Sequence, residues 1–208
     1  MPTARVYGGR PGAARQQERR LRLMDAGLEL FGTIGYRATT MRAVLQQAQL
    51  SERYFGENFE SLRDLFLAVY DKAADQVIAA TIAAVQGAQG DASAEIRAGM
   101  VAYLESVAVD PRGARIMLVE IVAVGPSLYD HGMSKMDIFS EFMAQRAAEL
   151  GLKSSRVNVK LLARALVAAM HELQRQTVFE QPPLPMPVAV EHAVYLFDAT
   201  MEALRREA

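Results

Sequence analysis

The apolar residues of this chain recur at intervals of three and four along most of its length, and this spacing restricts what it can fold into. Leu21, Met24, Leu28 and Phe31, for example, fall on one face of a helix. No segment shows the sustained alternation of apolar and polar residues that a half-buried strand needs. With 208 residues and 51% hydrophobic composition, the chain can bury a sizeable core. The sequence therefore predicts an all-α protein.

Capping residues, glycines and prolines divide the chain into about nine predicted helices. The first contains residues 21–31 and ends near Gly32 or Gly35, because glycine tolerates the left-handed conformation at a helix C-terminus. The others are expected at 41–48, about 51–56, 62–86, 92–109, 112–124, 127–150, about 155–180 and 188–206. Helix-capping side chains are expected at Thr39 or Thr40, Ser51, Ser61, and Ser154 or Ser155.

Composition excludes several classes of site. The chain has no Cys, which excludes a disulfide framework, a Cys-ligated zinc site and a cysteine nucleophile, and which fits a reducing cytoplasm. His171-Glu172 begins like a zinc-protease helix, but Arg175 stands where the second His ligand would be. The longest uncharged stretch, 76–90, is too short to span a bilayer, and residues 1–12 contain no apolar signal segment. We expect a cytoplasmic protein without enzymatic activity, cofactor, metal or membrane contact.

Charge is distributed unevenly, although the formal net charge is only −1. Residues 1–60 contain nine Arg against six acidic residues, and six of these Arg lie in the first 22 residues, where Glu18 is the only acid. A short Arg-rich arm ahead of a folded segment suits phosphate contacts, although a solvated tail without a ligand has the same composition. We expect residues 1–17 to form a flexible basic arm.

Two short capped helices with a tight connection between them, an amphipathic helix before and a long helix after, form a helix-turn-helix unit. Its distinctive motifs are Leu28-Glu29-Leu30-Phe31, Gly35-Tyr36, Ala38-Thr39-Thr40, Ala48 with Leu50-Ser51, Arg53-Tyr54-Phe55, and Asn58-Phe59 with Leu65. In this order and spacing, residues 19–70 resemble the DNA-binding domain of TetR-type transcriptional regulators. The rest of the chain resembles that family only as a helical pattern.

The resemblance implies a domain organisation and a function. A helix-turn-helix domain is expected at 18–60, and a helical ligand-binding and dimerisation domain at 61–208. The expected function is that of a ligand-responsive regulator, a repressor that binds a palindromic operator in double-stranded DNA as a homodimer. A small, mostly apolar effector would release it.

The third helix of such a unit lies in the major groove, so its first residues come closest to base edges and phosphates. Arg53 can form paired hydrogen bonds with the O6 and N7 acceptors of guanine, and Tyr54 can pack on a thymine methyl or bond a phosphate. Phe55 is expected in the core. The candidate DNA-binding residues are Thr40, Arg42, Ser51, Glu52, Arg53, Tyr54, Asn58 and Arg63.

Three positions depart from the family pattern. Gly56 stands where a Tyr commonly touches the DNA backbone, Glu57 where His is frequent, and Leu62 where a Lys often opens the fourth helix. We therefore expect this chain to depend more on Arg53, Arg63 and the N-terminal arm. Gly9-Arg10-Pro11 is a weak match to a minor-groove hook, since no second Arg flanks it.

The remaining helices supply candidates for an effector cavity and a dimer interface. Apolar and Met-rich positions suit an adaptable cavity, in which Tyr103, Glu120 and His171 could orient a ligand. The candidate effector-binding residues are Met100, Tyr103, Leu104, Met117, Ile121, Phe139, Phe142, Met143, Met170 and His171. The last two helices offer small residues and apolar area, including Leu161 and Tyr195, for a two-fold dimer. The candidate dimerisation residues are Leu162, Leu166, Ala169, Val194, Phe197 and Met201.

Each of these faces has an alternative explanation. The apolar positions of the middle helices can fill a core without leaving a cavity, and those of the last two can close a monomer. The departures at Gly56 and Leu62 also allow a second function, a helical protein-interaction module whose helix-turn-helix no longer binds DNA. DNA binding that depends on Arg53 would separate the two.

Overall fold

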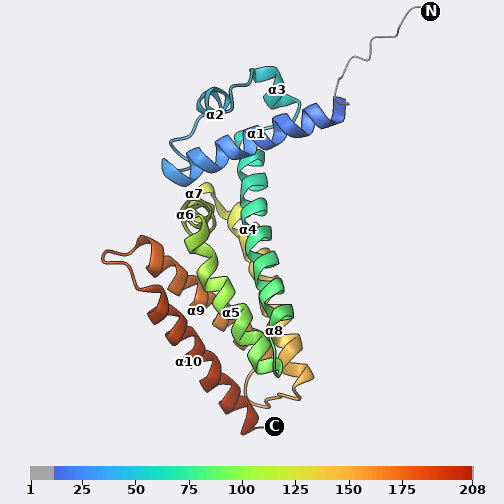
Figure 1. The fold of residues 1–208 in the computed structure, drawn as a ribbon, viewed down its shortest axis with the longest axis vertical. Coiled ribbons are helices and arrows are strands. Elements are labelled where there is room, and N and C mark those ends of the chain that lie inside the picture. Colours follow the sequence, from blue (N-terminus) through green and yellow to red (C-terminus); the bar gives the residue numbers. More distant parts are fainter. Residues whose placement is uncertain (1–11, 208) are drawn as a thin grey trace, which may run out of the picture. The chain divides into compact units, whose positions relative to one another are not determined.

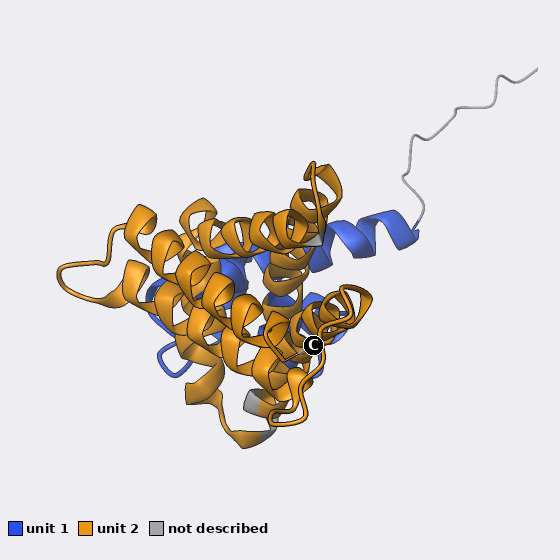
Figure 2. Cartoon of the chain, turned by 90° about the horizontal axis from the view of Figure 1, so that it is seen from below, with its two compact units in different colours: residues 1–69 blue, residues 70–208 orange. Residues whose placement is uncertain are grey.

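The computed structural model describes residues 12–207, apart from the side chains of Ala92, Ser127 and Tyr129. All regular elements in this range are helices, which confirms the predicted all-α class (Figure 1). The chain forms two compact units, residues 1–69 and residues 70–208, coloured separately in Figure 2. The expectations for the arm residues Arg5 and Arg10, and for the hook at 9–11, lie outside the described residues.

The first unit consists of three helices and the start of a fourth, in the predicted order (Figure 1). The helices are α1 (Gly12–Thr33), α2 (Met41–Ala48), α3 (Glu52–Gly56) and α4 (Leu62–Gly87). Gly35, at φ 89°, ends α1 as expected, and the Thr40 hydroxyl accepts a hydrogen bond from Ala43 N at the start of α2. Ser61 likewise accepts from Asp64 N at the start of α4.

An aromatic cluster joins these helices into one core. The Phe31 and Phe66 rings pack edge to face at 5.3 Å between centroids, and Tyr36 packs on Phe66 at 5.2 Å. Phe55 of α3 is 2% exposed, which places it in the core as predicted. Edge-to-face aromatic pairs add to the stability that burial alone provides.

Both boundaries of this unit differ from the predicted ones. Residues 12–17, expected in the flexible arm, form the first turns of α1, so the regular structure begins before residue 18, the predicted start of the domain. The first unit also extends to Val69 and not to residue 60. The reason is that Leu65, Phe66 and Val69, on the first two turns of α4, are buried with the core of the first unit.

The second unit contains the rest of α4 and all later helices (Figures 1 and 2). They are α5 (Ala92–Val109), α6 (Pro111–Arg115), η1 (Ile116–Glu120), α7 (Ile121–Val124), α8 (Pro126–Glu149), α9 (Val159–Phe179) and α10 (Met186–Arg205). Within this unit α9 packs against α5, α8 and α10. None of the helices in the described chain is long and apolar enough to cross a membrane.

The predicted helix at 112–124 is continuous but irregular. Its middle, η1, is a π-helical turn in which the Ile121 N–H bonds the Ile116 carbonyl, so one extra residue is accommodated. Such π turns often occur at functional sites. In this chain the turn contains Met117 and Leu118, both of which line the cavities described below.

The start of α9 was predicted a few residues too early. The Ser154 hydroxyl accepts hydrogen bonds from Arg156 N and Val157 N, which makes a local turn and not a helix cap. Asn158 is the cap, because its side chain accepts from Leu161 N. Ser and Asn both favour this position, so the sequence alone did not decide between them.

Candidate nucleic-acid interface and core cavity

The start of the third helix lies on the surface of the first unit. Ser51, Glu52 and Arg53 are exposed, while Phe55 on the opposite side of α3 is buried. The connection before α3 is short because Gln49 adopts a left-handed conformation at φ 52° and its N–H bonds the end of α2. This conformation is uncommon for a residue other than Gly, Asn or Asp, and here it makes the tight turn that was predicted at Gln49-Leu50.

The Arg53 side chain is 84% exposed. Its Nε lies 3.0 Å from Oε1 of Glu57, one turn later on the same helix. An exposed ion pair of this kind contributes only a few tenths of a kcal/mol. The pair therefore leaves the guanidinium available to a duplex, but Glu57 competes with DNA for it.

The two capping residues differ in what their hydroxyls do. Thr40 accepts from Ala43 N at 3.2 Å, and its O–H remains able to donate to a phosphate. Ser51 occupies the corresponding position before α3 but makes no capping hydrogen bond through its side chain. Arg42 and Arg63 are also exposed. Five of the predicted DNA-binding residues therefore lie on the surface and can donate hydrogen bonds to phosphate oxygens or base edges. They are Thr40, Arg42, Ser51, Arg53 and Arg63.

Tyr54 and Asn58 are placed differently from these five. Tyr54 is half-buried, and the Cζ of the Arg19 guanidinium lies over its ring, 4.4 Å from the ring centroid. The Asn58 side-chain amide donates to the Tyr54 carbonyl at 2.7 Å, closing the end of α3. This amide helps to close the end of α3, and the DNA contact of Asn58 stays a prediction.

Basic residues of α1 hold the helix-turn-helix together, a role that the sequence did not reveal. Arg22 donates to the Ala48 carbonyl at 2.5 Å and to the Gln49 carbonyl at 3.2 Å, so it secures the turn between α2 and α3. Arg20 donates to the Asn58 carbonyl at 2.8 Å, and its guanidinium lies 4.2 Å from the Phe59 ring centroid. Part of the N-terminal Arg surplus therefore stabilises the fold. No periodicity or motif marks these residues, because their partners are backbone atoms.

Gly56 provides a test of the local stability of α3. A Cβ at this position would meet nothing within 4 Å, and Gly is disfavoured in helices. We predict that Gly56→Ala raises the free energy of unfolding by up to about 1 kcal/mol, as measured by urea denaturation. Gly27→Ala is the matched control, because its Cβ would lie 3.1 Å from both Phe31 and Val69, and it should destabilise the protein. Equal effects of the two variants would contradict this account.

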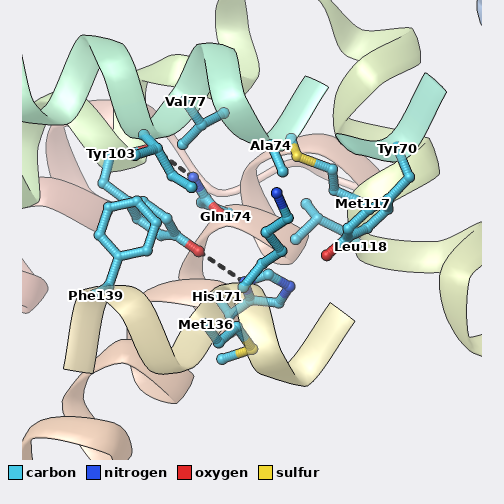
Figure 3. Close-up of a pocket in the computed structure, with 12 residues that line it drawn as sticks. Tyr70, Ala74, Val77, Tyr103, Met117, Leu118, Met136, Phe139, His171 and Gln174 are labelled. Carbon is cyan, nitrogen blue, oxygen red and sulfur yellow. Dashed lines mark hydrogen bonds between the residues drawn. The ribbon is translucent and has the colours of Figure 1, made fainter. Parts of the chain in front are cut away.

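A cavity lies inside the second unit, between side chains of α4, α5, η1, α8 and α9 (Figure 3). It is narrow, about 30 Å³, which is room for about two water molecules. An adjoining cavity of about 280 Å³ shares part of its lining and offers room for a small organic molecule. The shared residues are Tyr70, Met117, Leu118, Met136 and His171.

Half of the predicted effector residues line these cavities. Those that do are Tyr103, Met117, Ile121, Phe139 and His171. The other five pack in the surrounding core: they are Met100, Leu104, Phe142, Met143 and Met170, of which Met143 also lines a separate cavity of about 20 Å³. Helical periodicity shows which residues face inward, but it cannot show which neighbours leave a space between them. For these five residues the effector role stays a prediction.

Several lining residues were missed. Tyr70, Ala74 and Val77 lie at intervals of four and three on α4, and Gln174 follows His171 by three on α9. On each of the two helices, this spacing places the lining residues on one face. A Gln at an inward-facing position among apolar neighbours is the sequence signal that could have identified Gln174 as a lining residue. Glu120, by contrast, is buried in an ion pair with Arg115 at 3.0 Å and lines neither cavity.

Polar contacts connect opposite walls of the central cavity. The Tyr103 hydroxyl and Nδ1 of His171 are 2.8 Å apart, joining α5 to α9 (Figure 3). The Gln174 amide donates to the Tyr103 carbonyl. Burial raises the pKa of the Tyr103 hydroxyl and lowers the pKa of the His171 imidazole, because both lose solvation of their charged forms. Both side chains are therefore neutral at pH 7.5.

The candidate dimerisation residues fall into two groups. Phe197 and Met201 are 2% and 5% exposed inside the core of a single chain, so they cannot present apolar area to a second copy. The prediction for these two was wrong, because helical spacing alone does not show which apolar side faces inward. Leu162, Leu166, Ala169 and Val194 are half-buried. The exposed apolar side chains of α9 and α10 include Leu161, Ala165, Ala168, Tyr195, Leu196 and Ala199.

Comparison with known proteins yields both a family and a set of related folds. Residues 23–69 match the family model described as bacterial regulatory proteins, tetR family. A relative, the HTH-type transcriptional activator FasR of Mycolicibacterium smegmatis, is 24% identical over 184 residues, which cover 86% of this chain and 81% of FasR.

Two solved structures share the fold. A TetR-like transcriptional regulator from Rhodococcus sp. RHA1 superposes with a TM-score of 0.72 at 18% identity, covering 93% of this chain and 99% of that one. The fatty acid degradation regulator FadR from Bacillus halodurans superposes with a TM-score of 0.74 at 11% identity, covering 86% and 94%. At these identities the likeness concerns the fold alone.

Proposed function

This chain belongs to the tetR family of bacterial regulatory proteins and is a transcriptional regulator, and we propose that it is a repressor released from its operator by a small effector. The observation that carries this proposal is the exposed start of α3, where Arg53 is 84% exposed beside the free Ser51 hydroxyl. A short helix with its first residues on the surface can enter a major groove and contact base edges.

We propose that two copies bind a two-fold symmetric operator. Sequence-specific binding by helix-turn-helix proteins usually uses two half-sites about one helical turn apart, so two chains must be joined. The exposed apolar side chains of α9 and α10 support such a joining, since Leu161 is 65% and Tyr195 is 73% exposed to water. A self-complementary apolar face of this kind suits an isologous dimer.

We further propose that the cavities of the second unit receive the effector. Their lining is mostly apolar with few polar groups, which is typical of small-molecule sites. Helix α4 has residues in both units, so it is the element through which we propose that a bound ligand affects DNA binding. A ligand that prefers the conformation with weaker DNA binding lowers DNA affinity by its difference in affinity for the two conformations.

The direction of regulation is a separate part of the proposal. FasR is named an activator, whereas we propose repression here by exclusion of polymerase from an operator that overlaps a promoter. Such a protein acts where the chromosome is, in the cytoplasm. Transcription from the promoter beside its own gene, measured in vitro with and without the protein, should fall when the protein is added. An increase in transcription would contradict repression while leaving DNA binding intact.

DNA binding itself is tested by fluorescence anisotropy on fragments from upstream of its own gene. We expect one fragment to bind at low salt, and binding to disappear with Arg53→Ala. If neither protein binds any fragment, the alternative of a protein-interaction module gains support. Mass spectrometry of small molecules that copurify with the chain would then identify what occupies the cavities.

Removal of the Glu57 charge is expected to strengthen DNA binding, whereas Arg53→Ala is expected to weaken it. Glu57 neutralises Arg53 at 3.0 Å and also lies 3.4 Å from Arg19. We predict that Glu57→Gln strengthens DNA binding several-fold and steepens its salt dependence, because a negative charge near phosphate is removed and a guanidinium is released. Anisotropy at a series of salt concentrations measures both. Weaker binding would show instead that Glu57 orients Arg53 for its contact.

A further inference from the structure

The cavities of the second unit contain a small number of polar side chains among apolar ones. In the narrow cavity these are Tyr70, Tyr103, Lys135, His171 and Gln174, while the rest of its lining is Ala, Val, Ile, Leu, Met and Phe. Because polar groups in such sites fix the orientation of the ligand, their remaining hydrogen-bonding capacity indicates which ligand chemistry fits.

Four of the five have protein partners, although His171 uses only its Nδ1 atom. The Tyr103 hydroxyl bonds Nδ1 of His171 at 2.8 Å, and the Gln174 amide donates to the Tyr103 carbonyl. The Lys135 ammonium lies 2.9 Å from a carboxylate oxygen of Asp75 and 3.5 Å from one of Asp71. Breaking these contacts to bind a ligand would leave buried or paired groups unsatisfied, so a ligand gains little from them.

Two polar groups remain able to form hydrogen bonds with a ligand. Within the described residues, neither Oη of Tyr70 nor Nε2 of His171 has a hydrogen-bond partner, and both residues line both cavities. Figure 3 shows the Tyr70 hydroxyl directed toward the His171 ring, on the side of the ring away from Tyr103. The two free groups thus face the same space from α4 and α9.

Both groups are neutral and both can donate. Burial, and then the charge of Asp71, raise the pKa of Tyr70 to about 12, and burial lowers the pKa of His171. A phenol is a better donor than acceptor, so we assign the Tyr103 proton to the bond with Nδ1, which leaves the imidazole proton on Nε2. Two donors, the Nε2–H of His171 and the Oη–H of Tyr70, then face the same part of the cavity.

The surroundings disfavour a charged ligand. Lys135 is the cation in the narrow cavity, and it is neutralised by two carboxylates. At the adjoining cavity, Arg164 pairs with Asp137, and Arg175 pairs with Glu172 and Glu180. A charged ligand would find no unpaired counter-charge among these side chains, so it would gain little from ionic contacts.

We propose that the effector is an uncharged, largely apolar molecule with a carbonyl oxygen that accepts hydrogen bonds from Nε2–H of His171 and Oη–H of Tyr70. Ketones, esters and lactones have this chemistry, since a carbonyl oxygen has two lone pairs and no donor. The inference rests on the proposed function, because it takes these cavities as the effector site.

Four probes of similar length test it by isothermal titration calorimetry on the whole protein at pH 7.5: 2-octanone, 1-chlorooctane, octanoate and octylammonium. We expect 2-octanone to bind more tightly than the other three. Tyr70→Phe should weaken 2-octanone binding about 3- to 10-fold, the effect of one lost neutral hydrogen bond, and leave 1-chlorooctane unchanged. Ser134→Ala is the control, since it removes an exposed hydroxyl from α8 at a residue that lines neither cavity, and it should leave the binding of both neutral probes unchanged.

Three outcomes would overturn the inference. Octanoate or octylammonium could bind more tightly than 2-octanone, Tyr70→Phe could lower the affinity for 2-octanone and 1-chlorooctane equally, or 2-octanone could fail to bind at millimolar concentration. His171→Phe gives a second readout and should abolish the preference for 2-octanone over 1-chlorooctane. DNA binding of the same preparation is measured separately. If 2-octanone binds as expected but leaves DNA binding unchanged, the proposed effector role fails and the site chemistry stands.

Discussion

Arg53→Ala is expected to abolish sequence-specific DNA binding with little loss of folding stability. Paired hydrogen bonds from Arg to guanine contribute roughly 1 to 3 kcal/mol of discrimination per site. A symmetric operator contains two such contacts, so the variant should lose roughly 2 to 6 kcal/mol, about 30-fold to 10⁴-fold in affinity. Anisotropy with the specific fragment and a scrambled one measures this loss. Stability should hold, because the Arg53 side chain is 84% exposed and its ion pair with Glu57 is weak.

Two further variants make this result specific. Arg156→Ala removes the same charge from a side chain that is 80% exposed in the second unit, and it should bind DNA like the parent protein. Arg53→Lys keeps the charge but loses the planar fork, so it should retain non-specific binding and lose discrimination. If Arg53→Ala still distinguished the two fragments, α3 would not be the recognition helix.

Glutamates in place of the exposed apolar side chains Leu161 of α9 and Tyr195 of α10 are expected to separate the proposed dimer. In the double variant Leu161→Glu with Tyr195→Glu, like charges would meet across a two-fold axis where apolar area is now exposed. The mass in sedimentation experiments should fall from twice 22.8 kDa to a single chain. Affinity for a two-half-site operator should fall by about 10²-fold to 10⁴-fold, because the second contact is no longer intramolecular.

Val109→Glu is the control for this experiment. Val109 is 87% exposed at the end of α5, so Val109→Glu adds a negative charge, one against the two of the double variant, to a different helix of the same unit. It should leave the dimer and the DNA affinity unchanged. A double variant that remained a dimer would place the interface elsewhere, and a monomer with full operator affinity would contradict the need for two joined chains.

Local features of the first unit could be predicted from the sequence with little error. α2 begins and ends at the predicted residues, Thr40 caps it, and Gly35 ends α1. These features depend on residues within one turn of each other, so propensity and capping chemistry suffice. The same holds for the burial of Phe55 on the inner side of α3.

Other features depend on contacts between distant parts of the chain. Arg22 bonds carbonyls of residues 48 and 49, and Arg20 bonds the carbonyl of residue 58, so basic residues that suggested phosphate contacts stabilise the turn instead. Asn58 likewise closes α3 through a backbone carbonyl. Backbone acceptors are the same for every residue type, so no sequence pattern identifies them.

The sequence by itself determined the all-helical class, the helix-turn-helix and the place of Arg53 near the start of its third helix, because helical periodicity and end-capping are local properties. Only the tertiary structure decided which inward-facing side chains fill the core and which leave a space. Met100 and Met117 lie in similar apolar patterns, yet the first is packed in the core and the second lines a cavity. The difference arises from how five helices pack against each other, and packing depends on the shapes of all the neighbours at once.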